Sequence, residues 1–153
     1  MRIAYVDSSL VVRYYLLNDP QHAEAVALID DGDSAIVTGT WTVIQASGAL
    51  VRACRSARVD AAAILARLDL DMTEGPITLV AEPQEDVERI ALDIVRTDGI
   101  RAMDAWHIAV ASLALPELSG PGDQAVFVTR DSDQARAAER RGLAVWDSLR
   151  AEE

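Results

Sequence analysis

The sequence predicts an α/β protein, an α/β/α sandwich around a mainly parallel central sheet. Short apolar runs typical of strands alternate with longer segments typical of helices along the chain, and this alternation favours parallel strands joined by helices. The chain has 153 residues, half of them hydrophobic and a quarter charged, which is typical of a globular protein with a substantial core. We therefore expect a single domain over residues 1–153.

The first half of the chain contains two predicted strands and four predicted helices. Each strand is a short apolar run bounded by polar or turn residues. The second helix begins near Pro20 and is stopped by Gly32. In chain order, the segments are a strand at 2–6, helices at 9–17 and 20–32, a strand at 34–39, and helices at 40–57 and 59–72.

The second half contains three predicted strands and three predicted helices. The clearest helix starts at Pro83 with acidic residues in its first turn and ends at Gly99. A loop rich in glycine and proline is expected at 116–124. In chain order, the segments are a strand at 77–81, helices at 83–99 and 100–115, a strand at 125–129, a helix at 131–142 and a strand at 143–147.

The composition excludes several kinds of chemistry. All 14 basic residues are arginine, whereas a Walker-type phosphate loop and a Schiff-base enzyme both need a lysine. The single cysteine, Cys54, cannot form an internal disulfide and is predicted to be a small packed residue. The two histidines, His22 and His107, are too few for a histidine-rich metal centre. We expect His107 to be a packed or hydrogen-bonded helix residue and not a general base.

Nothing in the sequence predicts export or membrane insertion. The apolar part of the N-terminal segment is short and is interrupted by Asp7, unlike a signal peptide. No apolar run is long enough to cross a bilayer, so we expect a cytoplasmic protein with no membrane partner. The formal net charge of −11 argues against a nucleic-acid partner, unless a divalent metal supplies positive charge where a phosphate binds.

Three aspartates are predicted to converge. Asp7 directly follows the first strand, Asp131 closely follows the strand at 125–129, and Asp104 lies near the start of a strongly apolar helix. Ligands of open parallel sheets bind beyond the carboxyl ends of the strands. Two carboxylates about 4 Å apart repel by roughly 4 kcal/mol at an effective dielectric near 20. Because oxygen ligands suit Mg²⁺ or Mn²⁺, we predict that such an ion joins the three acids.

Each acid also has a plainer explanation. Asp7 and Asp131 are both suited to cap the helix that follows them, and Asp133 is suited to the first turn of its helix. Asp104 could cap its own helix or pair with Arg101, three residues earlier. Capping is the stronger interpretation for any one acid alone, and the joint placement shifts the balance toward a site.

Four segments resemble the PIN-domain ribonucleases, in the right order and over nearly the whole chain. They are YVDSSLVVRYYL, TWTVIQASGALVRA, RAMDAWHIAVA, and VFVTRDSD followed by AAERRGLAVW. The subgroup that they resemble most is the VapC-type toxins of bacterial toxin–antitoxin pairs. The resemblance implies a homodimer, Mg²⁺ or Mn²⁺ held by acidic residues, and endonucleolytic cleavage of RNA, such as transfer, ribosomal or messenger RNA. It also implies a cognate VapB-type antitoxin that silences the enzyme by covering its site.

The resemblance also implies roles for individual residues. The acids that it matches are the first, third and fourth of the family's cluster, together with an accessory position. In chain order, the matches are Asp7 as the first acid, Ser8 or Ser9 as the hydroxyl that usually follows it, Asp104 as the third acid, Thr129 as the threonine before the fourth acid, Asp131 as the fourth acid and Asp133 as the accessory metal position.

One position departs from the family pattern. The segment TVIQASGALVRA places Gln45 where the family normally carries a glutamate. Glutamine has nearly the same shape and can offer an oxygen to a metal, but it lacks the charge, so metal binding and activity should weaken. The change is either introduced to disarm a toxic nuclease, tolerated by a natural enzyme, or the mark of a natural inactive member. We favour an introduced change, because nothing else in the predicted site looks eroded.

The expected chemistry is metal-assisted phosphodiester hydrolysis with Asp7, Gln45, Asp104 and Asp131 at its centre. One alternative is an aspartyl-phosphate phosphatase with Asp7 as nucleophile, but such enzymes need a second aspartate two residues later and a lysine. Ser9 stands at that position and the chain has no lysine. The other alternative is a catalytically inactive PIN-like interaction protein, in which Gln45 marks a lost activity.

Some basic and aromatic residues suit RNA contacts less well than ordinary structural roles. Three arginines at a spacing of three share one side of a helix, which we interpret as a solvated face. Trp106 and Trp146 are assigned to the core or to dimer contacts. The arginines are Arg52, Arg55 and Arg58.

Overall fold

A computed structural model describes residues 1–146 of the chain. Five strands alternate with seven helices in this part of the chain. In chain order, the elements are β1 (Arg2–Val6), α1 (Ser8–Tyr15), α2 (His22–Asp30), β2 (Ser34–Gly39), α3 (Trp41–Ser56), α4 (Ala62–Glu74), β3 (Ile77–Val80), α5 (Gln84–Asp98), α6 (Ala102–Leu118), β4 (Gln124–Val128), α7 (Ser132–Arg140) and β5 (Val145–Trp146).

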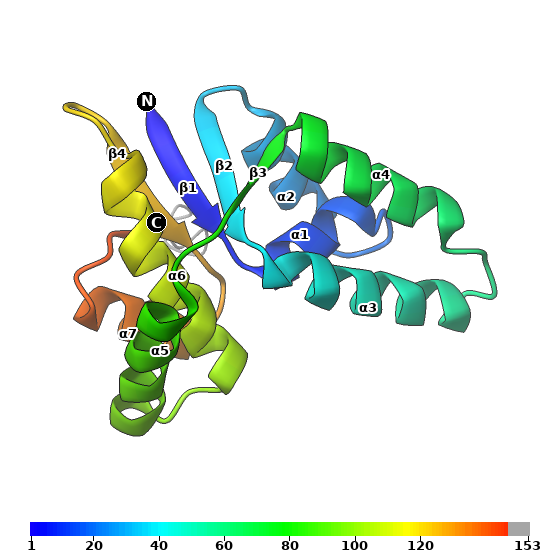
Figure 1. Ribbon diagram of the computed structural model, residues 1–153. Coiled ribbons are helices and arrows are strands. Elements are labelled where there is room, and N and C mark those ends of the chain that lie inside the picture. The colour runs from blue at the N-terminus through cyan, green and yellow to red at the C-terminus, as the bar shows by residue number, and fades with distance from the viewer. Residues whose placement is uncertain (147–153) are drawn as a thin grey trace.

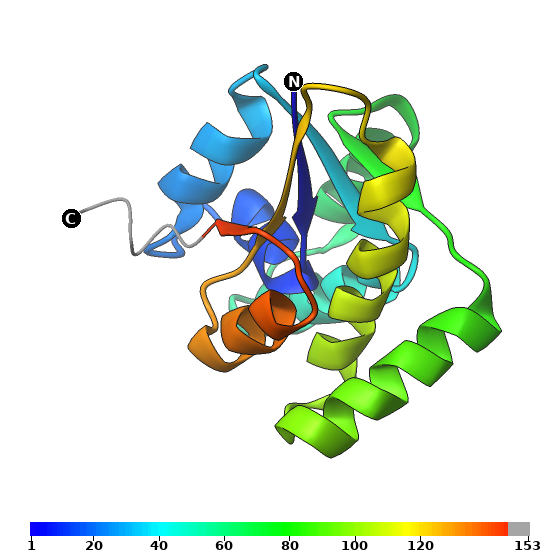
Figure 2. The same ribbon diagram turned by 90° about the vertical axis from the view of Figure 1, so that its left-hand side faces the viewer.

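The five strands form one sheet in the order β3-β2-β1-β4-β5, and every neighbouring pair is parallel. The prediction of an α/β fold on a parallel sheet is therefore confirmed. The strands run downward from the N-terminal label in Figure 2, so their carboxyl ends share one edge. The chain proceeds from β1 to β2 on one side and later returns to place β4 on the other side. The strand order thus reverses between β1 and β4, and ligands of such sheets usually bind beyond the carboxyl ends of the strands at this point.

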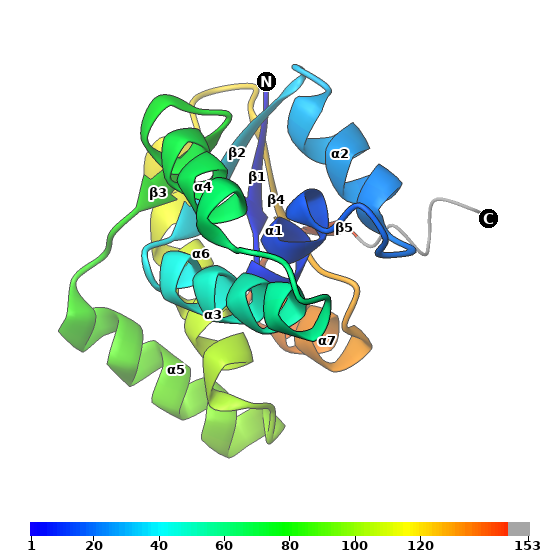
Figure 3. The same cartoon turned by 90° about the vertical axis from the view of Figure 1, so that its right-hand side faces the viewer.

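Helices cover both faces of the sheet, because alternate strand residues point to opposite sides. Helices α1 to α4 lie on one side of the sheet and α5 to α7 on the other (Figures 1 and 3). One core cluster contains Val6 and Val128 with residues of α1 to α4. The other contains Tyr5 and Phe127 with residues of α5 to α7. The two faces therefore have separate cores, and the strand ends lie between them.

The boundaries of several elements differ from those predicted. Helix α6 continues to Leu118 with Pro116 inside it, so the predicted loop at 116–124 begins too early. The backbone N–H and the hydroxyl of Ser119 both donate to the carbonyl of Leu115, which satisfies the end of the helix beyond the proline. Strand β5 is only two residues long, and position 147 of its predicted span lies outside the described residues.

Two further predictions concern the single cysteine and the lack of a membrane-spanning helix. Cys54 is buried in α3, as predicted for a packed residue. None of the helices within residues 1–146 is long and apolar enough to cross a membrane.

Candidate active site

Asp7 lies where β1 ends and α1 begins, next to the strand β4. The Val6–Val128 pair closes the β1–β4 register, so the residues that follow both strands leave the sheet side by side. Asp7 is the N-cap of α1, and its Oδ1 accepts hydrogen bonds from the Leu10 backbone N–H at 3.2 Å and from the Ser9 hydroxyl at 2.8 Å. The capping interpretation is thus correct for Asp7, but it engages only one carboxylate oxygen.

The buried position of Asp7 is electrostatically unfavourable. The side chain is 7% exposed, and burial raises the pKa of its carboxyl, with a smaller contribution from the nearby charge of Asp104. The hydrogen bonds from Ser9 and Leu10 oppose that shift. None of the ion pairs within residues 1–146 involves Asp7, and the more distant charge of Arg13 lowers its pKa only slightly against the effect of burial.

Asp131 occupies the matching position after β4, as the N-cap of α7. Its Oδ1 accepts from the Gln134 backbone N–H at 2.9 Å, and its own N–H donates to Thr129 Oγ1 at 3.0 Å. Gln134 is fully buried and joins two elements: its Oε1 accepts from the Thr129 hydroxyl, and its Nε2 donates to the Asp104 carbonyl at 3.3 Å. This buried network sets Asp131 relative to the start of α6.

Asp104 lies in the first turn of α6, and its partner in the structure is Arg101. The Arg101 Nε donates to Asp104 Oδ2 at 2.9 Å, and another guanidinium nitrogen lies 3.6 Å from Asp131 Oδ2. The pairing with Arg101 that was the plainer explanation for Asp104 is therefore present. Arg101 is 81% exposed, whereas the Asp104 side chain is 20% exposed. An exposed cation thus pairs with acids that the fold holds in place.

Asp7, Asp104, Asp131 and Gln45 line one cavity of about 850 Å³ at the carboxyl ends of β1 and β4. Ser8 and Ser9 also line it, and Thr129 supports it from below through Gln134. Asp133 does not line this cavity. It lies in an adjoining hollow with Arg101, Asp104 and Asp131, and it pairs with Arg136.

The donor chemistry of this cavity fits a hard divalent cation. Asp7 and Asp131 each use only one carboxylate oxygen to cap a helix, so the second oxygen of each is left for a ligand. Carboxylate oxygens are the ligands that Mg²⁺ and Mn²⁺ prefer. Within residues 1–146, no three His, Cys, Asp or Glu side chains are close enough together to form a complete metal site. The three carboxylates line one cavity, and Arg101 pairs with two of them, Asp104 and Asp131.

Gln45 enters the cavity from α3 and contacts a buried histidine. Its Oε1 lies 2.9 Å from His107 Nε2, and His107 Nδ1 lies 2.9 Å from the Tyr5 hydroxyl. His107 is 1% exposed, and burial lowers the pKa of its imidazole to about 4. Burial also raises the pKa of the Tyr5 hydroxyl. Both groups are therefore neutral at neutral pH, and His107 is a hydrogen-bonded helix residue, as predicted.

The sequence analysis missed three residues that shape this site. Tyr5 and Gln134 were not singled out, and Arg101 was considered only as a partner of Asp104. The strand period could have drawn attention to Tyr5, because residues two apart in a strand point the same way. No local signal identifies Gln134, whose partners come from β4 and α6.

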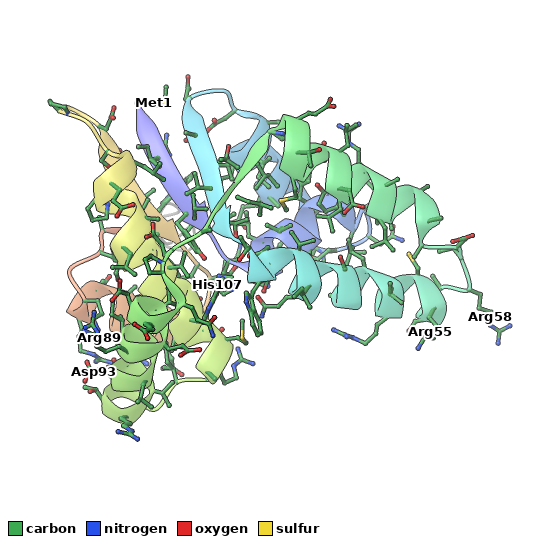
Figure 4. All side chains as sticks on the ribbon, viewed as in Figure 1. Met1, Arg55, Arg58, Arg89, Asp93 and His107 are labelled. Carbon is green, nitrogen blue, oxygen red and sulfur yellow. The ribbon has the colours of Figure 1, made fainter. Side chains whose placement is uncertain are left out.

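Two tryptophans and three arginines were predicted to have structural roles rather than contacts with RNA. Trp106 packs against the core that contains Tyr5, and Trp146 packs against the opposite core with the Arg2 guanidinium 4.7 Å from its ring. Arg55 lies in the last turn of α3, whereas Arg58 lies beyond the end of α3 and has a φ of 58°. The prediction that the three arginines share one side of a helix is therefore wrong for Arg58. The side chains of Arg55 and Arg58 both project away from the sheet (Figure 4). Arg52 differs, because it lines a hollow with Ser8, Ser9 and Gln45.

A comparison with protein-family models matches the PIN domain over residues 4–140. The chain belongs to the PIN domain family. The match spans every element from β1 to α7 and includes all the acids that line the cavity. Members of this family are typically nucleases, which cleave phosphodiester bonds.

Three solved structures are similar to this PIN domain over most of its length. PAE2754 from Pyrobaculum aerophilum is 23% identical, with 99% of this chain and 97% of that chain covered and a TM-score of 0.61. FitAcB from Neisseria gonorrhoeae is 19% identical, with 94% and 96% covered and a TM-score of 0.62. VapC20 from Mycobacterium tuberculosis, a toxin that cleaves the sarcin–ricin loop, is 22% identical, with 88% and 94% covered and a TM-score of 0.60.

At these identities the solved structures establish the shared fold alone. No curated protein matches the chain.

Proposed function

We propose that this PIN domain is a VapC-type endoribonuclease toxin that depends on Mg²⁺ or Mn²⁺. The observation that carries the proposal is the cavity at the β1–β4 edge, where Asp7, Asp104 and Asp131 present carboxylate oxygens from three distant parts of the chain. The buried Asp7 forms no ion pair within residues 1–146, which is unfavourable for a lone carboxylate and favourable for one that binds metal. The similarity to VapC20 supports the toxin assignment.

The three aspartates would hold the metal, with Asp133 as an accessory group from the adjoining hollow. When bound, the divalent ion supplies Lewis acidity for hydrolysis of a phosphodiester. The chain's own residues set the geometry: Ser9 and Leu10 fix one oxygen of Asp7, and Thr129 and Gln134 fix the approach of Asp131 to Asp104. Only the remaining carboxylate oxygens are left to face the metal and the substrate.

RNA binding to a chain of net charge −11 requires local positive charge. Arg13 lines the cavity itself, and Arg52 lines the hollow beside it. Neither arginine takes part in the ion pairs found within residues 1–146. We assign these two guanidinium groups to the phosphates that flank the cleaved bond, because arginine forms strong charge-assisted hydrogen bonds to phosphate and neither group is held in an ion pair among the described residues.

A neighbouring groove suits an antitoxin segment. This apolar groove has a volume of about 620 Å³ and runs between α5, α6 and Trp41, which is 52% exposed. Ala102 and Met103 line both the groove and the acidic cavity, so a chain lying in the groove would reach the acids. We propose that a cognate VapB-type antitoxin binds there, and that the toxin is a cytoplasmic homodimer with one domain per chain.

The test of the nuclease starts from the Gln45→Glu protein, since the charge absent from Gln45 is expected to limit metal binding. In Mn²⁺ or Mg²⁺ this protein should cleave single-stranded RNA much faster than the unmodified chain, and EDTA should stop it. Adding Asp104→Asn should abolish the cleavage, whereas adding Asp133→Asn should reduce it less. Cleavage that survives EDTA or the Asp104→Asn change would refute the assignment.

The second candidate is a catalytically inactive PIN-like interaction protein. The contact between Gln45 Oε1 and His107 favours it, because this oxygen is already engaged and is not offered to a metal. The two candidates differ in what Gln45→Glu does. A natural inactive member should bind Mn²⁺ poorly even after that change, whereas a disarmed nuclease should regain binding.

A further inference from the structure

A buried hydrogen-bonded chain connects the end of β2 to Gln45. The Gly39 backbone N–H lies 3.1 Å from the Tyr5 hydroxyl, which lies 2.9 Å from His107 Nδ1, and His107 Nε2 lies 2.9 Å from Gln45 Oε1. A Cβ atom at Gly39 would lie 2.8 Å from the Tyr5 hydroxyl, so glycine is required for this approach. Figure 4 shows His107 near the centre of the molecule, between α6 and the start of α3.

The donors in this chain have one consistent direction. A backbone N–H can only donate, so the Tyr5 oxygen accepts from Gly39. On the other side of the His107 ring, Gln45 Oε1 can only accept, so the ring donates from Nε2 and its Nδ1 accepts the Tyr5 proton. A neutral imidazole carries one proton, so the nitrogen that accepts from Tyr5 leaves its proton on Nε2. The His107 Nε2–H then donates to Gln45 Oε1. Burial keeps the ring neutral, as described above.

This direction decides which atom of Gln45 faces the cavity. The oxygen is engaged by His107, and the side-chain nitrogen takes part in no hydrogen bond within residues 1–146. It is also not among the buried polar atoms that lack a partner in those residues. Because Gln45 lines the cavity together with Asp7 and Asp104, the amide nitrogen is the group that reaches the open space beside these acids.

We propose that Tyr5 and His107 are positioning residues that turn the N–H group of residue 45, and not its oxygen, toward the catalytic cavity of this chain. Gln45 then acts as a hydrogen-bond donor to an anionic oxygen, either a carboxylate or a substrate phosphate, and not as a metal ligand. With glutamate at this position, the same His107 N–H would take one carboxylate oxygen and leave the other facing the acids. The catalytic meaning rests on the proposed function, but the orientation does not.

The first experiment measures the tautomer directly in the unmodified protein. Long-range ¹H–¹⁵N correlation spectra of ¹⁵N-labelled protein distinguish a protonated Nε2 from a protonated Nδ1. The chain contains a built-in reference, because His22 Nδ1 lies 2.9 Å from the carbonyl oxygen of Arg13 and must donate to it. We expect His22 to carry its proton on Nδ1 and His107 on Nε2, with a His22→Gln variant for assignment. A proton on Nδ1 of His107 would overturn the proposal, whatever the protein does to RNA.

The second experiment uses Tyr5→Phe in two backgrounds, with Mn²⁺ affinity as the readout. Without the Tyr5 proton the tautomer of His107 is free, so Gln45 can turn its oxygen to the cavity and Mn²⁺ affinity should rise. In the Gln45→Glu background, the same change removes the group that orients the carboxylate, and affinity should fall by about 10–100-fold, as for other outer partners of metal ligands. Tyr5→Phe also removes the hydroxyl that accepts from the Gly39 N–H. This loss is the same in both backgrounds, so it does not contribute to the difference between them.

Opposite signs in the two backgrounds support the positioning role. Equal signs would show that Tyr5 only stabilises the fold, and the proposal would fail. If neither background binds Mn²⁺, the proposed nuclease function fails, while the tautomer spectrum still decides the orientation of Gln45.

Discussion

Two buried aspartates with opposite surroundings distinguish the structural part of this molecule from its candidate site. Asp71 in α4 is 2% exposed and Asp7 after β1 is 7% exposed. Both side chains therefore lie largely out of water, where an unpaired carboxylate is costly. They differ in whether the chain itself supplies the groups that make the charge tolerable.

The environment of Asp71 is complete. The Tyr15 hydroxyl donates to Asp71 Oδ2 at 2.8 Å, and the Arg67 Nε lies 3.1 Å from Asp71 Oδ1. The hydrogen bond joins α1 to α4, and Arg67 supplies the counter charge from one turn earlier on the same helix as Asp71. Asp71 thus has every feature of a structural carboxylate.

The environment of Asp7 is incomplete. It accepts two hydrogen bonds on a single oxygen and forms no ion pair in the part of the chain that the structure describes. Besides burial, the nearby charge of Asp104 raises its pKa, and the charge of Arg13 lowers it less. Arg101 pairs with Asp104 and Asp131 instead. The difference teaches that burial of a carboxylate does not by itself mark a site. The mark is a buried carboxylate that lines a cavity and whose remaining oxygen lacks a donor among the described residues.

The largest expected effect separates the two aspartates by metal affinity. In the Gln45→Glu protein, Asp7→Asn removes a charged metal ligand, and we expect Mn²⁺ affinity to fall by at least about 100-fold, more than the loss of an outer partner costs. The matched change Asp71→Asn should leave the affinity unchanged. Isothermal titration with Mn²⁺ measures both, and equal losses would mean that Asp7 is no more a ligand than Asp71 is.

The next effect concerns stability and should be specific to Asp71. Asp71→Asn replaces the charged acceptor of the Tyr15 hydroxyl and of Arg67, so we expect the free energy of unfolding to fall by about 1–3 kcal/mol. For a domain of this size, each kcal/mol lowers Tm by about 2–4 °C. Urea unfolding of the two proteins measures the loss. An unchanged midpoint would indicate that α1 and α4 are held together by apolar contacts alone.

Asp7→Asn should act in the opposite direction on the metal-free protein. Burial raises the pKa of Asp7 in the folded state above the unfolded value of about 3.9. The folded protein therefore holds this proton more tightly than the unfolded chain, and stability declines as pH rises through that window. Asparagine keeps an oxygen for the Leu10 N–H but carries no charge. We expect Asp7→Asn to raise Tm at about pH 7 in EDTA, and the gain to shrink toward about pH 4; a gain independent of pH would contradict the electrostatic cause.

The smallest effect concerns two exposed arginines: Arg101, which pairs with Asp104 and Asp131 at the site, and Arg67, which pairs with Asp71. Arg101→Ala frees Asp104 and Asp131, so Mn²⁺ affinity of the Gln45→Glu protein should rise a few-fold at most, because exposed ion pairs are weak. Arg67→Ala should lower stability slightly and leave Mn²⁺ affinity as it was. A fall in affinity with Arg101→Ala would show that this side chain helps to build the metal site and does not compete with it.

Most of the fold and the position of the acids were predictable from the sequence. Alternating strand and helix patterns place Asp7 and Asp131 directly after buried strands, and parallel pairing brings those strand ends together. The predicted ends of helices were less accurate, as the helical Pro116 shows, because side-chain contacts at helix ends decide them. The caps of Asp7 and Asp131 were foreseen as alternatives to a site, and the structure has both a cap and a cavity at each.

The sequence by itself determined which residue types follow the strands, since strand periodicity and the absence of lysine are local and countable. Only the tertiary structure decided how these groups are completed. Tyr5 and His107 are 102 residues apart and His107 and Gln45 are 62 apart, so no local pattern specifies that the Gln45 oxygen is engaged. A hydrogen bond depends on the position and proton of both partners, and those are known only once distant segments have packed against each other.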